Sequence, residues 1–176
     1  MSRLYRFRSP NSYVAVVPLA EFPPNFSGGQ SAWPEHITLI PDFDHVGLRD
    51  DMLCAVRGVT LTETPFTITL SGPHGLYDSR PAQDVVAGED RLRQLHENLV
   101  HGLGLVSCRI IDPTYTCLGE GYSPHVSSEK PLPVGEEIGV WSVLVIAKYT
   151  KGNALVSLAS DKVLDGKFRL GGTIGA

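Results

Sequence analysis

The chain has 176 residues, an apolar fraction of 42% and a formal net charge of −4 at pH 7. That length is enough for one well-packed domain or for two small lobes that share a core. The acidic balance weighs against proteins that grip long DNA or RNA, because such binding depends on clustered Lys and Arg. It still allows a small anionic substrate, which needs only a local positive pocket.

The cysteines and the N-terminus bear on the cellular compartment. Cys54, Cys108 and Cys117 form no CxxC pair, which is typical of reduced thiols in a cytosolic protein. The basic N-terminal residues precede no apolar signal region. No run reaches the ~18 apolar residues that span a membrane. We therefore expect a soluble, cytoplasmic protein with no membrane partner.

The first part of the chain predicts two strands and a helix. Residues Tyr13–Leu19 form a short β-branched run, typical of a buried strand. A loop rich in Pro, Gly and Ser is expected over Glu21–Pro34, followed by a strand over His36–Ile40. A helix is expected next, with Asp44 as its N-cap and its end near Gly58.

The middle of the chain predicts two more strands and a second helix. Phe66–Leu70 alternates apolar and polar residues, which indicates a strand. Gly72–Gly75 is expected to form a turn, and Gln83–Gly88 a short strand. From Asp90 to Leu103 the leucines recur at helical spacing, and Gly104 is expected to end that helix.

The last third predicts mainly strands. Arg109–Ile111 is a candidate strand, and two apolar runs, Ile138–Tyr149 and Ala154–Val163, flank Lys151–Asn153 as a hairpin would. The Gly-rich tail from Asp165 onward is expected to be irregular. Strands paired in this order, with helices against one side, indicate an α+β fold.

Two tripeptides carry most of the functional information, His36-Ile37-Thr38 and His125-Val126-Ser127. In each, a histidine and a hydroxyl residue flank a β-branched apolar residue. Successive side chains of a strand point to opposite faces, so the histidine and the hydroxyl share one face. Two such strands side by side would present two imidazoles and two hydroxyls to one pocket.

This set of groups suits phosphodiester cleavage without a metal ion. One group must activate the nucleophile and another must protonate the departing oxygen. Histidine serves both roles near neutral pH, since its unperturbed pKa is about 6.5. The hydroxyls can donate hydrogen bonds to the phosphate oxygens, on which charge accumulates.

The segments Pro34–Leu39 and Tyr122–Ser127 resemble the paired HxT/S signatures of the 2H phosphoesterase superfamily, which includes 2′-5′ RNA ligase-like proteins and cyclic nucleotide phosphodiesterases. The resemblance implies one bilobal domain over residues 1–176, with two pseudo-symmetric antiparallel-sheet lobes, outer helices and a central cleft. It implies cofactor-independent hydrolysis of a cyclic phosphate or 2′-5′ phosphodiester in a small nucleotide or oligonucleotide. The catalytic acid/base pair would be His36 and His125, and the phosphate-binding residues would be Thr38 and Ser127.

Several other residues have two interpretations each. Trp33 and Tyr122 each precede a motif histidine by three residues, so either ring is a candidate for stacking on a base or for packing at the lobe rims. In its Gly-Pro-His-Gly segment, His74 is either a solvated turn residue or part of the cleft mouth.

Rival functions also follow from the sequence. A metal-dependent hydrolase would use His36, Asp42, Asp44 and His45, although these follow no recognised ligand spacing. A serine hydrolase is disfavoured, because Gly121–His125 lacks the last glycine of a nucleophile elbow. A non-catalytic module that binds a nucleotide or an RNA end is the third alternative.

Overall fold

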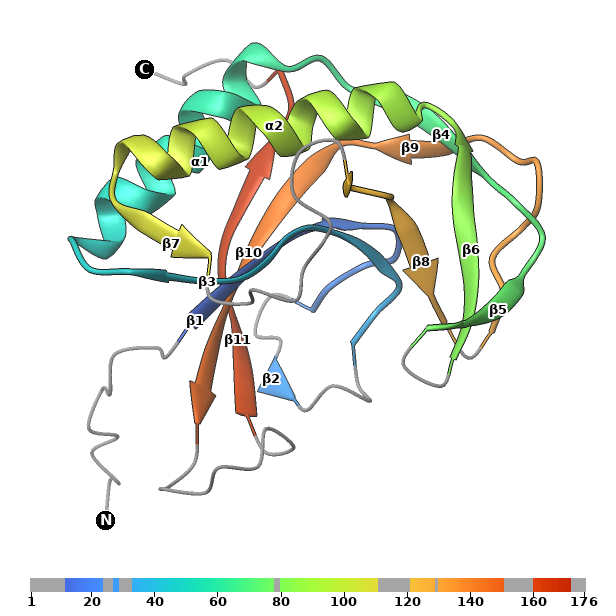
Figure 1. The fold of residues 1–176 in the computed structure, drawn as a ribbon, viewed down its shortest axis with the longest axis horizontal. Helices are drawn as coiled ribbons and strands as arrows, with labels where there is room; N and C mark the ends of the chain where they lie inside the picture. Colours follow the sequence, from blue (N-terminus) through green and yellow to red (C-terminus); the bar gives the residue numbers. More distant parts are fainter. Residues whose placement is uncertain are drawn as a thin grey trace.

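Figure 1 shows the computed structural model, which describes residues 12–23, 27–28, 33–77, 80–110, 121–128, 130–150 and 160–171. The elements in chain order are β1 (Ser12–Pro18), β2 (Ser27–Gly28), β3 (His36–His45), α1 (Arg49–Thr62), β4 (Phe66–Leu70), β5 (His74–Tyr77), β6 (Arg80–Ala87), α2 (Glu89–Leu105), β7 (Cys108–Ile110), β8 (His125–Ser127), β9 (Ile138–Val140), β10 (Ser142–Thr150) and β11 (Ser160–Arg169).

The strands form a curled antiparallel sheet with both helices on one side (Figure 1). Its order is β2-β11-β10-β1-β3-β8-β6-β4-β9, with β5 against β6 and β7 against β3. One group of strands ends at β3 and the other begins at β8, so the two groups meet at the β3–β8 pair. This arrangement confirms the α+β fold predicted from the sequence.

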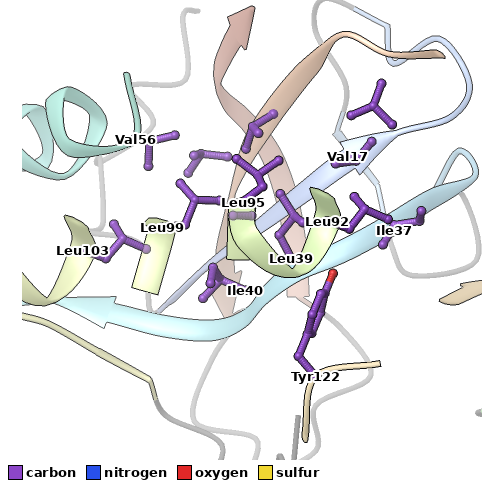
Figure 2. Packing of buried hydrophobic residues seen from close by; sticks show 14 of the residues in the cluster. Val17, Ile37, Leu39, Ile40, Val56, Leu92, Leu95, Leu99, Leu103 and Tyr122 are labelled. Atoms are coloured by element: carbon purple, nitrogen blue, oxygen red, sulfur yellow. The ribbon is translucent and has the colours of Figure 1, made fainter. Parts of the chain in front are cut away.

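The main core lies between the helices and the sheet (Figure 2). The leucines of α2 form the predicted stripe, and Leu92, Leu95 and Leu99 are fully buried. They pack with Ile37 and Leu39 of β3, which are also fully buried. Burial of each such side chain contributes about 1.5–3 kcal/mol. The face of β3 that bears Ile37 is thereby fixed toward the helices.

The first helix begins later than the sequence predicted. Asp44 is not its N-cap, because β3 continues to His45 and pairs with β7. The guanidinium of Arg109 on β7 donates to Asp44 Oδ2 at 2.6 Å. The helix starts at Arg49 and continues through Gly58 to Thr62, with Met52, Val56 and Thr60 buried on one side. Packing of that side carries the helix past its glycine.

The tail of the described chain is also more regular than expected. Residues 166–169 are not irregular, because β11 runs to Arg169 and pairs with β10. The hairpin of β10 and β11 confirms the predicted pairing from Ser142 onward, whereas Ile138–Val140 forms the separate strand β9, which pairs with β4. The predicted Lys151–Asn153 turn and residues 154–159 lie outside the described residues. Cys117 lies outside them as well.

Smaller differences concern the turns. The expected turn over Gly72–Gly75 ends early, since β5 begins at His74. The helix α2 continues one residue beyond Gly104. Gly88 precedes α2 at a φ of 78°, where a Cβ atom would lie 2.4 Å from the carbonyl oxygen of Thr67. Only glycine fits that link between β6 and α2 without distortion. No helix in the described segments is long and apolar enough to cross a membrane.

Candidate active site

The site is built at the seam between β3 and β8. Ile37 of β3 lies directly opposite Val126 of β8, and both side chains are fully buried on the helix side of the sheet. Ser128 follows β8 and Glu35 precedes β3. The Ser128 hydroxyl donates to Glu35 Oε1 at 3.3 Å. These two links, one in the backbone and one between side chains, fix the register of the seam.

The register gathers the four motif residues on the opposite face of the sheet. Antiparallel pairing around the buried pair sets His36 opposite Ser127. It sets Thr38 opposite His125 in the same way. Directly opposed residues have Cβ atoms about 4.5–5.5 Å apart, and diagonal ones about 7–8 Å apart. The imidazoles therefore occupy one diagonal of a small square and the hydroxyls occupy the other.

Both imidazoles are held by the backbone in the same way. His36 Nδ1 donates to the Pro34 carbonyl at 2.7 Å, and His125 Nδ1 donates to the Ser123 carbonyl at 3.0 Å. The acceptor precedes the histidine by two residues in each case. Since a carbonyl only accepts, Nδ1 carries the hydrogen and Nε2 is the nitrogen that can exchange a proton.

The hydroxyl of Ser127 has an unmet hydrogen-bonding need. Its Oγ is shielded from solvent and makes no hydrogen bond within the described part of the chain. A buried hydroxyl without a partner is destabilising by about 1–3 kcal/mol. A phosphate oxygen between the imidazoles would supply an acceptor once the Ser127 side chain rotates toward them, because Oγ is closed to a ligand in this conformation.

Beside His36 the surface is aromatic and apolar. The Trp33 ring lies 4.9 Å from the His36 ring, centroid to centroid, and the Phe22 ring lies 6.4 Å away. Phe22 is a buried member of a small second core that includes Val16 and Leu144. Trp33 is partly exposed and also packs against this second core, so its stacking on a base stays a prediction.

Beside His125 the surface is polar and includes Asp84 and His74. Of these two residues, only His74 was identified from the sequence. Asp84 of β6 lies directly opposite His125, and His74 Nε2 lies 3.2 Å from Asp84 Oδ2. His74 is in strand β5 rather than in a solvated turn. Asp84 gave no signal in the sequence, because only the β6–β8 pairing brings it to the motif.

Two buried side chains, those of His96 and Tyr122, support β3 by donating to its backbone carbonyls. Val16 pairs with Thr38 and Ala15 pairs with Ile40, so the intervening Leu39 forms a β-bulge. Buried His96 donates from Nδ1 to the Leu39 carbonyl at 2.8 Å. This contact satisfies the carbonyl of Leu39, the residue that the bulge takes out of the ladder.

Tyr122 belongs to this support and not to a base-binding surface. Its hydroxyl donates to the Thr38 carbonyl at 3.0 Å, and its ring stacks on His96 with centroids 4.1 Å apart. The side chain is 4% exposed, and Figure 2 shows it directed into the core. Its ring has no open face for a base, so packing, the alternative interpretation, describes it. Burial lowers the pKa of His96 and favours its neutral form.

The residues of the metal-site alternative are engaged separately. Asp42 forms an ion pair with Lys148, and Asp44 pairs with Arg109. His45 Nε2 donates to the Leu48 carbonyl at 2.7 Å. Across the described residues, no three His, Cys, Asp or Glu side chains are grouped as metal ligands.

Comparisons with known proteins support the fold. The chain matches solved structures of TT0787 from Thermus thermophilus (18% identity, TM-score 0.57, covering 92% of this chain and 98% of that chain) and of a phosphoesterase (13%, 0.56, 92% and 99%). It also matches E. coli LigT in complex with NADP+ (13%, 0.58, 93% and 100%). No family model and no curated protein sequence matches. These likenesses show that the chain shares the fold of those proteins over more than nine tenths of its length.

Proposed function

We propose that the protein is a metal-independent phosphodiesterase that hydrolyses a cyclic phosphate or a 2′-5′ phosphodiester in a small nucleotide or oligonucleotide. The observation that carries the proposal is the pairing of Ile37 with Val126. That pairing turns both imidazoles and both hydroxyls of the motifs to one face. The phosphate would lie between the four side chains.

Each group has a role in the proposed reaction. One imidazole accepts a proton from the attacking water through Nε2, and the other donates a proton to the ester oxygen that leaves. A P–O bond to water forms as the bond to the leaving oxygen breaks. The hydroxyls of Thr38 and Ser127 donate hydrogen bonds to the non-bridging oxygens. Each proton transfer is typically worth ~10²–10⁴ in rate.

The solved neighbours support a nucleotide as the ligand. LigT has been crystallised with 3′-AMP, with phosphate and with ATP. Of these ligands, 3′-AMP and ATP contain both the phosphate and the ribose that the proposed substrate shares. A small nucleotide fits the acidic net charge of this chain better than a long polyanion does.

The proposal is tested by incubating the protein with 2′,3′-cyclic nucleotides, cyclic oligonucleotides and 2′-5′ dinucleotides, with and without EDTA, and identifying the products. The two-histidine enzyme forms product at the same rate in EDTA. A metal-dependent hydrolase loses turnover in EDTA. A binding module retains ligand but forms no product. His36→Ala and His125→Ala must each lower the rate while His101→Ala, on the exposed side of α2, does not.

A further inference from the structure

The site face continues past His125 onto an acidic side chain. β8 pairs with β6, and Asp84 is directly opposite His125 in that pairing. Directly opposed residues project from the same face, with Cβ atoms about 4.5–5.5 Å apart. Asp84 therefore extends the group of motif side chains by one strand, at the His125 end of the imidazole diagonal.

Neighbouring residues hold the backbone and the side chain of Asp84 in place. β5 pairs with β6 and sets His74 opposite Ala82, on the face that Asp84 shares. His74 Nε2 contacts Asp84 Oδ2 at 3.2 Å. The Asp84 N–H donates to Ser71 Oγ at 3.0 Å, and the Ser71 N–H donates to the Asp84 carbonyl at 2.8 Å. The side chains of His74 and Asp84 are 56% and 50% exposed, so a ligand can reach them.

The two ends of the diagonal consequently differ in chemistry. The His36 end adjoins the rings of Trp33 and Phe22. The His125 end adjoins the carboxylate of Asp84. A diester with its phosphate between the imidazoles has one ester group at each end. The group next to His125 meets a hydrogen-bond acceptor that carries negative charge.

We infer that Asp84, oriented by His74, is a specificity-determining residue for that ester group; the inference rests on the proposed function for the position of the phosphate. A carboxylate only accepts hydrogen bonds, so Asp84 accepts one from a sugar hydroxyl. It repels a second phosphate at the same place. The preferred substrates are diesters whose ester group at this end carries free sugar hydroxyls and no terminal phosphate.

The test compares three ligands that differ by one phosphate: a 2′-5′ diadenylate, its 5′-phosphorylated form and its 3′-phosphorylated form. We expect the wild type to disfavour one phosphorylated form by about three- to tenfold in kcat/KM, as repulsion between partly exposed charges predicts. Asp84→Asn, which removes the charge and keeps the shape, brings that ratio close to one. Asp51→Asn removes an exposed carboxylate from α1, across the sheet, and leaves the ratio unchanged.

The role of His74 has its own test in the same ratio. His74→Ala removes the contact that orients the carboxylate and is expected to reduce the discrimination. His74→Gln retains a donor and is expected to restore it. A purely structural role would lower all three rates together and leave the ratio intact, which would overturn this part of the inference.

Dissociation constants of the same ligands, measured by calorimetry on His36→Ala and on His36→Ala combined with Asp84→Asn, separate this inference from the proposed function. If the wild type cleaves no diester but the affinity ratio changes with Asp84→Asn, the inference stands and the proposed function fails. If the diesters are cleaved and neither ratio depends on Asp84, the inference is overturned and the function stands. If none of the three ligands binds, the inference is overturned, and the proposed function is overturned as well only if the 2′,3′-cyclic nucleotides and cyclic oligonucleotides also give no product.

Discussion

Ile37 and Val126 lie opposite each other at the seam of β3 and β8, fully buried under the helices. The residue on either side of each must then point to the other face of the sheet. One buried apolar pair thereby orients two imidazoles and two hydroxyls that are separated by 89 residues in the chain. The orientation of the site depends on the core rather than on polar contacts alone.

Substitutions at adjacent residues of β3 should therefore affect different properties, stability at Ile37 and catalysis at Thr38. Ile37→Ala removes buried volume and is expected to lower the free energy of unfolding by about 2–5 kcal/mol. Thr38→Ala removes a phosphate hydrogen bond and is expected to lower kcat by about 10–10³, with a smaller loss of stability. Urea unfolding and steady-state kinetics on both variants check the separation. A Thr38→Ala variant with normal kcat would remove that hydroxyl from the mechanism.

The two histidines should behave as one catalytic unit. His36→Ala and His125→Ala are each expected to lower kcat by ~10²–10⁴. The double variant should be little worse than the poorer single variant, because removing either proton-transfer group already blocks the shared mechanism. kcat of the wild type should follow a bell-shaped pH profile. Strictly multiplicative losses, or a flat profile from pH 5 to pH 9, would contradict paired proton transfer.

The sequence predicts the orientation of the motif residues better than it predicts which residues surround the site. The alternation in His36-Ile37-Thr38 and His125-Val126-Ser127 places each histidine and hydroxyl on one face by local geometry, so these positions were predictable. Asp84 was not, because its closeness to His125 comes from the pairing of β6 with β8. Strand pairing depends on residues far apart in the chain, which a single sequence does not reveal.

The errors in the sequence analysis share a physical cause. Asp44 is a good helix cap in isolation, but its pairing with Arg109 keeps it in a strand. Tyr122 is amphipathic and adjacent to a motif, but the bulge at Leu39 leaves carbonyls in the core that it helps to satisfy. Tertiary contacts decided both positions against the local preference. The strong periodicity of α2 met no such competition, and that helix was predicted within about two residues.

Stability should fall in mild acid because of His96. Burial holds the pKa of His96 in the folded protein below its ordinary value, which is about 6.5 in the unfolded chain. The unfolded state therefore binds more protons below pH 6.5, and the free energy of unfolding decreases as pH falls through that range toward the folded pKa. Chemical unfolding between pH 8 and pH 5 measures the slope.

A variant isolates this contribution from the other titrating groups. His96→Gln is expected to be less stable at pH 8, because it disturbs the bond to the Leu39 carbonyl. Its stability should nevertheless decline less than that of the wild type between pH 7 and pH 5. His101→Gln, on the exposed side of the same helix, should retain the wild-type slope. Equal slopes in His96→Gln and the wild type would exclude His96 as the source.

Cys108 should be an unreactive thiol. Burial and the neighbouring Asp44 carboxylate raise its pKa to about 11. The thiolate is the reactive form, so iodoacetamide at pH 8 should modify Cys108 much more slowly than the exposed Cys54. Peptide mapping after timed alkylation measures both rates, and the difference should vanish in urea. Fast modification of Cys108 in the folded protein would contradict its protected environment.

Trp33 should report nucleotide binding. The chain has two tryptophans, Trp33 next to His36 and Trp141, which is 66% exposed at the β9 end of the sheet. In Trp141→Phe the remaining fluorescence comes from the site, and binding of a 2′-5′ dinucleotide should change its emission through contact with a base. Trp33→Phe leaves only Trp141, and its emission should not respond.

If the base stacks on Trp33, Trp33→Ala should also raise KM by roughly 5- to 150-fold, since base–aromatic stacking is worth about 1–3 kcal/mol. An unchanged KM in Trp33→Ala, together with no change in the emission of Trp141→Phe on binding, would show that the base binds at another surface.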